Sequence, residues 1–300
     1  MTIRVPALKT GDSIGVIAPA GPVTPSELHA GIALLEARGF RVILSPDLYA
    51  QRDYLAGDDE TRLREFHAMF ENREIKAVIC ARGGYGTLRL LHGIDFEVIR
   101  KNPKIFVGYS DITALHWAIY AKTRMVTIHG PMIKGLAENG RGNLDSLLDL
   151  VSSDRPFQYD FSGKTIVREG RARGVILGGN LCMICHLIGT PFMPSLKGAV
   201  LFLEDRGEPL YRIDRMLTQL RLSGLLEGLA GVIAGDFLDC GDPHAIYRLL
   251  DETLSDSDIP ILGGLPLGHG VENLSLPLGV EALLDTHSMS LSIIETGISS

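Results

Sequence analysis

The first half of the chain alternates short apolar segments with segments of helical period, and this alternation limits the fold more than any other feature. Each apolar segment is rich in β-branched residues and is closed by glycine or proline, which is typical of buried strands. The expected strands lie at residues 13–18, 41–44, 77–81, 105–107 and 125–128. Because helices separate them, the strands must run parallel, and the sequence predicts a doubly wound α/β sheet. Ligands bind such sheets at the carboxyl ends of the strands.

The helix between the first two strands carries signals at both of its ends. Thr24 is the expected N-cap, Pro25 occupies the first helical position, and Glu27 completes a capping box. Gly39 is the expected end of the helix. These four residues mark where the helix is expected to begin and end.

Past Pro131 the alternation loosens. Residues 137–170 contain several glycines and one short helical stretch, which indicates a linker between an N-terminal domain, residues 1–136, and a C-terminal domain, residues 171–300. The C-terminal domain is expected to hold strands at residues 174–180, 199–204, 232–234 and 288–294. A long helix around residues 210–220 is expected to pack over them.

Composition and charge exclude several classes of protein. The 300 residues are 45% hydrophobic, which suffices to bury a sizeable core, so disorder is not expected. The net charge of −7 offers no basic surface for nucleic acid. The first residues lack the pattern of a signal peptide, and no apolar run is long enough to span a bilayer. The sequence therefore predicts a cytoplasmic protein with no nucleic-acid or membrane partner.

Cysteine usage agrees with that compartment. The four cysteines are too few for a disulfide-built scaffold of this length. Cys182 and Cys185 form a CxxC pair with His186 beside it, but a structural zinc site needs four ligands and the sequence has no second pair. The surrounding residues are typical of an apolar helix, so we expect no metal ion there.

The segment from Ile105 to Asp111 carries the strongest chemical signal. An apolar strand runs into Gly108 and delivers Ser110 at the beginning of a helical pattern. A serine at such a sharp turn exposes its hydroxyl above the sheet, as a nucleophile requires. The helix N-terminus also supplies free backbone N–H groups and a partial positive charge for an oxyanion. The alternative is that Ser110 serves only as an N-cap.

A glycine-rich loop follows the strand that ends at Ala81. Residues 82–87 precede an expected helix at residues 88–92, so their amides face the same sheet edge as Ser110 and could hold an anion. The loop is not a dinucleotide fingerprint, because Arg89 stands at the position of the third glycine, and it lacks the Gly-Lys-Ser/Thr of a P-loop. The alternative is a tight turn that needs positive φ angles.

Two residue types in the second half could complete a site. Glu204 stands at the end of an apolar strand, where a carboxylate is fixed and still reaches a cleft; Asp205 and Glu208 are its rivals. His269 lies between two glycines in a loop, where helical packing does not explain it. A solvated loop histidine is the alternative.

Two other histidines are weaker candidates for a base. His129 also follows a strand of the first domain and is the competing base. His116 is less favoured because it lies inside the expected helix after Ser110.

Six motifs stand in order along the chain. They are Arg82-Gly83-Gly84-Tyr85-Gly86, Gly108-Tyr109-Ser110-Asp111, His129-Gly130-Pro131, Gly178-Gly179-Asn180, Phe202-Leu203-Glu204-Asp205 and Gly268-His269-Gly270. In this order they resemble the LD-carboxypeptidase family of serine peptidases, which includes the microcin C self-immunity proteins. The resemblance extends over nearly the whole chain.

The resemblance implies a fold and a set of catalytic residues. It implies a flavodoxin-like first domain that carries the serine and a smaller, β-rich second domain that carries the glutamate and the histidine. The implied triad is Ser110, Glu204 and His269. The implied oxyanion hole uses the backbone amides of Asp111 and Gly84, with Gly83 as the alternative to Gly84.

The resemblance also implies a reaction. Such an enzyme is a serine carboxypeptidase that cleaves the L,D-peptide bond to the terminal D-alanine of murein tetrapeptides in peptidoglycan recycling, without metal or cofactor. The expected substrate-binding residues are Arg82, Tyr85, Asn180 and Arg206. The expected partners are the murein peptide and, in a homodimer, a second copy of the chain.

Three other functions stay open on the sequence. An amide hydrolase of this family could instead inactivate a microcin C-like aminoacyl-nucleotide antibiotic. A broad serine amidase or esterase would keep the triad without preferring a D-residue. A non-catalytic two-domain binding module would explain a cleft without chemistry, and it would leave Ser110 unlabelled by a fluorophosphonate.

Overall fold

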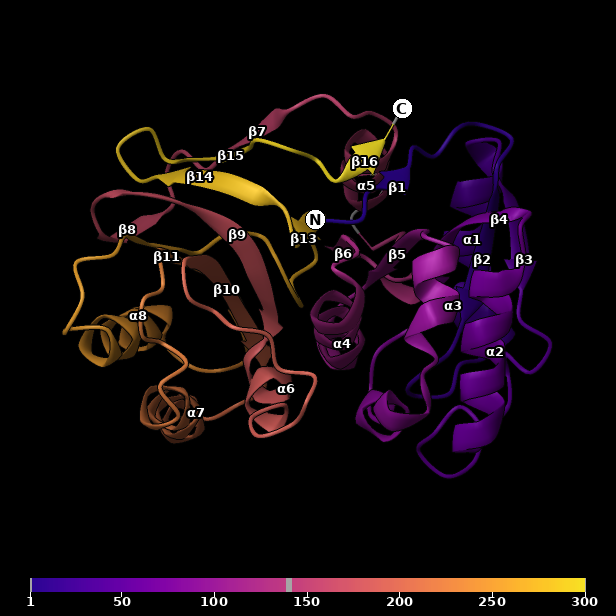
Figure 1. Ribbon diagram of the computed structural model, residues 1–300, viewed down its shortest axis with the longest axis horizontal. Coiled ribbons are helices and arrows are strands. Elements are labelled where there is room, and N and C mark those ends of the chain that lie inside the picture. Colours follow the sequence, from indigo (N-terminus) through magenta and orange to yellow (C-terminus); the bar gives the residue numbers. More distant parts are fainter. Residues whose placement is uncertain (1, 139–141, 300) are drawn as a thin grey trace.

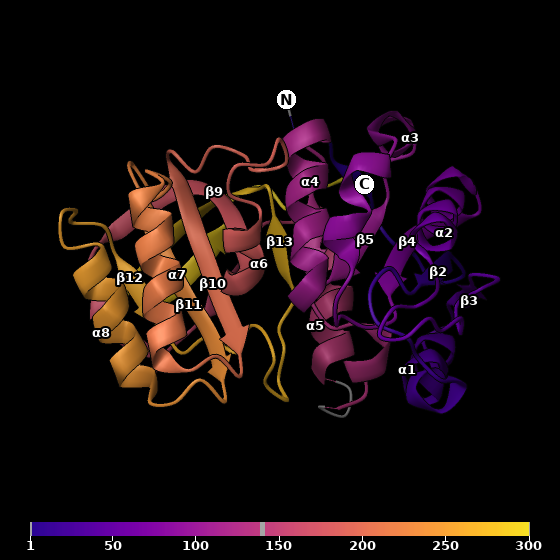
Figure 2. The ribbon, with the colours of Figure 1, turned by 90° about the horizontal axis from the view of Figure 1, so that it is seen from below.

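The computed structural model describes residues 2–138 and 142–299 and places two sheets side by side (Figure 1). A six-stranded sheet forms mainly from the N-terminal half and an eight-stranded sheet mainly from the C-terminal half. Helix α4 (Thr113–Thr123) stands between them in both views (Figures 1 and 2). Among the described residues, no helix combines the length and the apolar character that a membrane span requires.

The first sheet has the order β13-β6-β5-β4-β2-β3. Its parallel strands are β2 (Ser13–Ile17), β3 (Arg41–Leu44), β4 (Ile75–Cys80), β5 (Ile105–Gly108) and β6 (Thr127–His129). Counted along the chain, these strands stand in the order 2-1-3-4-5, which is the flavodoxin-like arrangement. Strands β2 and β5 are buried along their whole length, as expected for a parallel sheet covered on both faces. The predicted doubly wound sheet is confirmed.

Helices and short 3-10 turns fill the connections of this sheet. They are α1 (Pro25–Ala37), α2 (Asp59–Glu71), α3 (Phe96–Lys101), η1 (Thr87–Arg89), η2 (Leu91–Gly93), η3 (Ser110–Ile112) and η4 (Ile133–Gly135). Helix α1 has the predicted capping box, with the backbone N–H of Thr24 donating to Glu27 Oε2 at 2.9 Å. The helix predicted at residues 88–92 is wrong. The 3-10 turns η1 and η2 replace it.

The second sheet has the order β7-β15-β14-β9-β10-β11-β12-β8. Its strands are β7 (Phe157–Asp160), β8 (Thr165–Arg168), β9 (Arg171–Asn180), β10 (Ala199–Arg206), β11 (Gly231–Leu238), β12 (Ile261–Gly263), β14 (Glu281–Asp285) and β15 (Ser290–Ile293). Strands β9 to β12 are parallel and form its centre, with antiparallel strands on both sides. All four strands predicted in the C-terminal domain are found, as β9, β10, β11 and β15.

Three helices cover this sheet from one side. Helices α6 (Leu181–His186), α7 (Leu210–Leu222) and α8 (Pro243–Thr253) lie together on that side in Figure 1. The predicted long helix is α7, whose buried residues recur at helical spacing: Ile213, Leu217 and Leu220.

Several segments tie the two halves of the chain together. Strand β13 (Leu276–Leu278) pairs antiparallel with β6 at the edge of the first sheet, and β1 (Val5–Pro6) pairs in parallel with β16 (Ile298–Ser299). The expected linker, residues 137–170, contributes β7 and β8 to the second sheet, together with helix α5 (Gly142–Val151). Its residues 139–141 lie outside the described residues. Segments from the linker and from the end of the chain thus join strands on both sides of the predicted division at residues 136 and 171.

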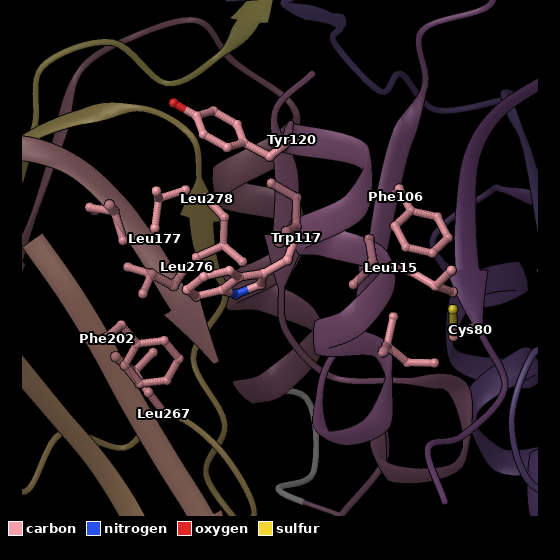
Figure 3. Packing of buried hydrophobic residues seen from close by; sticks show 14 of the residues in the cluster. Cys80, Phe106, Leu115, Trp117, Tyr120, Leu177, Phe202, Leu267, Leu276 and Leu278 are labelled. Atoms are coloured by element: carbon pink, nitrogen blue, oxygen red, sulfur yellow. The ribbon is translucent and has the colours of Figure 1, made fainter. Parts of the chain in front are cut away.

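Helix α4 is buried against both sheets. Figure 3 shows Trp117 on the side of α4 that faces Leu177 of β9 and Phe202 of β10, while Leu115 and Phe106 lie on the other side, toward the strands of the first sheet. The indole N–H of Trp117 donates to the carbonyl of Gly178, at the carboxyl end of β9, at 2.8 Å. This hydrogen bond joins α4 to β9 of the second sheet.

Candidate active site

Ser110 lies where β5 ends and a 3-10 turn begins, at the carboxyl edge of the first sheet. Its φ angle is +63°, in the left-handed region that non-glycine residues rarely adopt. A residue held there costs about 1–3 kcal/mol, and such residues cluster at functional sites. Tyr109, not Ser110, is the N-cap residue of the turn. The predicted sharp strand-to-helix turn is confirmed, and capping does not explain the serine.

The glycine-rich loop lies directly against Ser110. A Cβ atom added to Gly83 would stand 3.0 Å from Ser110 Cβ and 3.1 Å from its Oγ, so a side chain there would crowd the hydroxyl. Gly84 and Gly86 have φ angles of +123° and +132°, which strain any residue with a Cβ atom. The loop therefore needs glycine for its turn and also for its approach to the serine.

Two buried charged side chains hold this loop in place. Arg62 of α2 donates to the carbonyls of Pro19 at 2.5 Å and Gly86 at 3.1 Å. The carboxylate of Asp111 accepts the backbone N–H of Thr87 at 2.9 Å. Burial raises the pKa of Asp111, against the hydrogen bonds from Thr87. The loop and the serine turn are thus parts of one polar network.

Glu204 approaches the same cleft from the second sheet. Its side chain is fully buried near the end of β10, and its Oε2 lies 2.7 Å from His269 Nδ1. Because a carboxylate only accepts hydrogen bonds, Nδ1 carries the proton, and Nε2 has its lone pair free to act as a base.

The glycines on both sides of His269 make this contact possible. A Cβ atom on Gly268, whose φ is +131°, would stand 2.7 Å from Glu204 Oε2. Gly270 has no space for a side chain beside Asp236, whose carboxylate accepts the Gly270 N–H at 3.2 Å. Burial raises the pKa of Asp236 to about 6, against that hydrogen bond. Gly268 is therefore a steric requirement of the Glu204 contact, and Gly270 of the contact with Asp236.

The electrostatic surroundings of His269 suit a base. Burial by itself lowers its pKa, but the charge and hydrogen bond of Glu204 and the charge of Asp205 outweigh burial, so the pKa lies above its ordinary value of 6.5. Arg206 opposes this rise. The ring of Tyr109 packs edge-on against the ring of His269, with 5.0 Å between the ring centroids. Burial raises the pKa of Tyr109 to about 12. The phenol therefore stays neutral wherever a histidine base works.

Two adjoining cavities of about 270 and 380 Å³ open on these residues. They share four lining residues: Gly84, Ser110, Arg206 and His269. Among the hydrogen bonds of residues 2–138 and 142–299, none joins the Ser110 hydroxyl to His269. Catalytic hydrogen bonds commonly tighten only when substrate binds. The two side chains thus face one cleft from different domains.

Asp205 has different surroundings from Glu204, because neighbouring residues of a strand point to opposite faces. Its carboxylate accepts hydrogen bonds from the Asn180 side chain at 2.9 Å, from the Cys182 N–H at 2.9 Å and from the Arg206 N–H at 2.8 Å. Burial and the charge of Glu204 raise its pKa to about 6. Asp205 therefore holds the start of α6 and does not contact the histidine.

The remaining rivals are paired with other residues or buried away from the cleft. Glu208 pairs with Arg212 at 3.2 Å. His129 is fully buried beside the ring of Phe202, and neither of its ring nitrogens has a hydrogen-bond partner among the described residues. Burial holds its pKa well below the ordinary value. His116 Nε2 hydrogen-bonds a carbonyl at the end of β5 at 2.8 Å. Neither histidine lines the cleft.

The residues expected to bind substrate divide between the cavities. Arg82 lines the smaller cavity, Tyr85 and Asn180 line the larger one, and Arg206 lines both. Asn180 also caps α6 with its side chain. Lys134 lines the smaller cavity and was missed by the sequence reasoning. The available signal was its position shortly after β6, at the same sheet edge as Ser110.

The CxxC pair belongs to this region as well. Cys182 lines the larger cavity, and its Sγ lies 3.6 Å from His186 Nδ1. Burial raises the pKa of Cys182 to about 11, so the thiol is protonated at neutral pH. Within residues 2–138 and 142–299, no three His, Cys, Asp or Glu side chains gather as metal ligands would.

The fold is that of a two-domain α/β protein, and Ser110 and His269 line its cleft. The sequence pattern of the LD-carboxypeptidase N-terminal domain matches residues 14–130, and that of the C-terminal domain matches residues 173–284. The chain belongs to the LD-carboxypeptidase family, as the resemblance of its motifs predicted.

Similar proteins fall in two groups within this family. A probable murein peptide carboxypeptidase of Bacillus subtilis (strain 168) is 40% identical over 304 residues, which cover 98% of this chain and 94% of that protein. The structure of a muramoyltetrapeptide carboxypeptidase from Oxalobacter formigenes matches with a TM-score of 0.82 and 34% identity, covering 94% and 98% of the two chains. The microcin C7 self-immunity protein MccF, in complex with aspartyl sulfamoyl adenosine, matches with a TM-score of 0.92 and 27% identity over 99% of each chain.

Proposed function

We propose that this chain is a serine LD-carboxypeptidase that removes the terminal D-alanine of murein tetrapeptides, with Ser110, His269 and Glu204 as its triad. The observation that carries the proposal is the 2.7 Å contact between His269 and the buried Glu204 in a cleft that Ser110 also lines. The named murein carboxypeptidases among its relatives support the substrate.

In the proposed mechanism, His269 acts first as a base and then as an acid. Its Nε2 takes the proton of Ser110 Oγ as that oxygen attacks the carbonyl carbon of the scissile bond. Glu204 holds the Nδ1–H tautomer and stabilises the imidazolium that forms. Nε2 then gives the proton to the departing amine of D-alanine. Water attacks the acyl-enzyme by the same route and frees Ser110.

The oxyanion is expected to bind between the serine turn and the glycine loop. Asp111 lies in the first turn of a 3-10 helix, where a backbone N–H has no partner within the helix. Gly84 lines the cleft beside Ser110, which supports its N–H as the second donor. Each such donor contributes about 3–4 kcal/mol to the stability of the transition state.

The test is hydrolysis of L-Ala-D-Glu-diaminopimelate-D-Ala by the purified chain. The rate is measured as the release of D-alanine. Ser110→Ala and His269→Ala should each abolish release while the circular dichroism spectrum is unchanged, because triad residues act as a unit. Glu204→Ala should be severe but less complete. A chelator should leave the rate unchanged, since the proposed mechanism uses no metal. Substantial turnover by Ser110→Ala would exclude the triad.

A second candidate function is the hydrolysis of an aminoacyl-nucleotide antibiotic, which the close match to the fold of MccF favours. The same protein preparation, assayed on the tetrapeptide and on an aminoacyl sulfamoyl adenosine, separates the two candidates. A broad amidase would instead cleave the tetrapeptide and its terminal L-alanine epimer at equal rates. A cytoplasmic location and a homodimer stay predictions from the sequence.

A further inference from the structure

The two cavities that meet at Ser110 differ in the charged side chains that line them. The charged side chains that line the smaller cavity, apart from His269, are Arg82, Lys134, Arg206 and Glu138. The carboxylates that line the larger cavity are Asp111, Asp205 and Glu208, and Arg206 is its one lining arginine among the described residues. An anionic part of a ligand is therefore favoured in the smaller cavity.

The cations of the smaller cavity are held by the segment that leads into α1. Lys134 Nζ lies 2.6 Å from Glu27 Oε1, and the other oxygen of Glu27 belongs to the capping box of α1. Arg82 Nη1 donates to the carbonyl of Pro22 at 3.4 Å. Among the ion pairs of residues 2–138 and 142–299, none includes Arg82. The half-buried guanidinium of Arg82 is thus held by a carbonyl, and no carboxylate of the described residues pairs with its charge. A group that binds the carboxylate of a ligand needs these two properties.

We propose that Arg82 binds the terminal carboxylate of the substrate while Lys134 offsets the charge of Glu27, so that the smaller cavity holds the leaving D-residue and the larger cavity holds the rest of the peptide. This assignment rests on the proposed carboxypeptidase function. It fixes the direction of the substrate across Ser110, because the residues shared by the two cavities mark the position of the scissile bond. Arg82 is the direct ionic partner, and Lys134 offsets the charge of Glu27.

Chemistry and size support this direction. An exopeptidase must recognise a single residue and its carboxylate on one side of the bond, and a chain of several residues on the other. The smaller, cationic cavity of about 270 Å³ suits the single residue. The larger cavity of about 380 Å³ adds the apolar side chains of Leu88 and Met183. It suits the longer acyl part.

The experiment compares three peptides: the tetrapeptide, its C-terminal amide, and the tetrapeptide with the free carboxyl group of D-Glu amidated. For the wild-type chain, terminal amidation should lower kcat/KM by about tenfold or more, the effect of losing a charge-assisted hydrogen bond. Amidation at D-Glu should change it little. Arg82→Gln should lower kcat/KM on the free acid by about tenfold and change the rate on the terminal amide by less than about twofold.

Lys134→Met should reduce the preference for the acid in the same direction, because Glu27 then repels the carboxylate. Lys101→Met is the matched control, since Lys101 ends α3 before β5 begins and so lies at the opposite edge of the sheet from Ser110. It should keep the wild-type preference. Binding of the same peptides to Ser110→Ala, measured by calorimetry, gives the comparison without turnover.

Each contrary result has its own meaning. An unchanged acid-to-amide ratio in Arg82→Gln would overturn the assignment of the cavity. A strong effect of amidation at D-Glu that Arg82→Gln abolishes would reverse the direction of the substrate. Absence of hydrolysis of all three peptides by the wild-type chain would reject the proposed function, and the calorimetric comparison would then decide the carboxylate site by itself.

Discussion

The hydroxyl of Thr87 donates a hydrogen bond to the carbonyl of Asp111 at 2.6 Å, and the backbone N–H of the same threonine donates to the Asp111 carboxylate at 2.9 Å. Both residues are buried. One threonine of the glycine loop is thus bonded twice to the residue that follows Ser110. Because the two proposed oxyanion donors lie on these two segments, this pair of bonds fixes their separation.

Removing the hydroxyl of Thr87 should therefore reduce the rate more than the affinity. We expect Thr87→Val to lower kcat by about ten- to hundredfold, less than the loss of a whole oxyanion donor, with KM changed little. Thr87→Ser keeps the hydroxyl and should recover most of the activity. Steady-state kinetics on the tetrapeptide and the rate of labelling by a fluorophosphonate measure the effect. A loss in Thr87→Ser with full activity in Thr87→Val would show that the methyl packing of Thr87 matters and not its hydrogen bond.

The glycine before His269 should be irreplaceable for a steric reason. In Gly268→Ala the new Cβ atom would stand 2.7 Å from Glu204 Oε2 and would push the carboxylate or the histidine away. A misplacement of about 1 Å in a catalytic group can cost about a hundredfold in rate, and we expect at least that loss in kcat.

Gly198→Ala is the matched control for this substitution. Gly198 also has a positive φ, +75°, but nothing lies within 4 Å of its added Cβ atom. It should lose some thermal stability through backbone strain and keep full activity. An active Gly268→Ala protein would mean that the Glu204–His269 contact is not needed for catalysis.

Local sequence patterns predicted the parallel strands of the first sheet but only β9, β10, β11 and β15 of the second. The five parallel strands of the first sheet are short, β-branched runs closed by glycine or proline, and that signal is local. Strand β13 was not predicted, because it is a three-residue segment with Pro277 at its centre. It is a strand only because it pairs at the edge of the first sheet, where a missing N–H is tolerated.

The same limit applies to the site. Ser110 and His269 are visible as candidates because each lies in a turn marked by glycine. The contact between His269 and Glu204 joins residues 65 positions apart, and no spacing rule predicts it. The burial of His129, which excludes it as a base in an open cleft, also follows only from the fold. No local sequence pattern marks Thr87, because its hydrogen bonds to Asp111 depend on the tertiary structure.

The bond between Trp117 and Gly178 should contribute to the stability of the whole chain. Trp117→Phe removes the donor and leaves a buried carbonyl without a partner, which costs about 1–3 kcal/mol. The melting temperature should fall by about 2–4 °C for each kcal/mol. Unfolding should be followed by circular dichroism and not by tryptophan fluorescence, because Trp117 is the only tryptophan of the chain and the substitution removes it. Leu222→Ala, at a residue 83% exposed on α7, should leave the melting temperature unchanged.

The pH profile should show the influence of Glu204 on His269. Only the neutral imidazole can act as a base, so kcat/KM should rise with pH through the pKa of His269 and then become constant. Because this pKa is raised, the midpoint should lie above pH 6.5. Glu204→Gln removes the charge and keeps an acceptor for Nδ1–H. Burial is then the larger influence on His269, and the midpoint should move to lower pH.

Glu204→Gln should also lower kcat by roughly 10²- to 10⁴-fold, since the imidazolium loses its counter-charge in the transition state.

The dependence of the chain's stability on pH gives an independent check of the raised pKa of His269. A folded-state pKa raised above the unfolded value adds stability that is complete below about pH 6.5 and is lost as pH rises through the folded-state pKa. Any loss of melting temperature in Glu204→Gln should therefore be larger at pH 6 than at pH 9. A midpoint that stays in place in this variant would show that Glu204 does not set the pKa of the base.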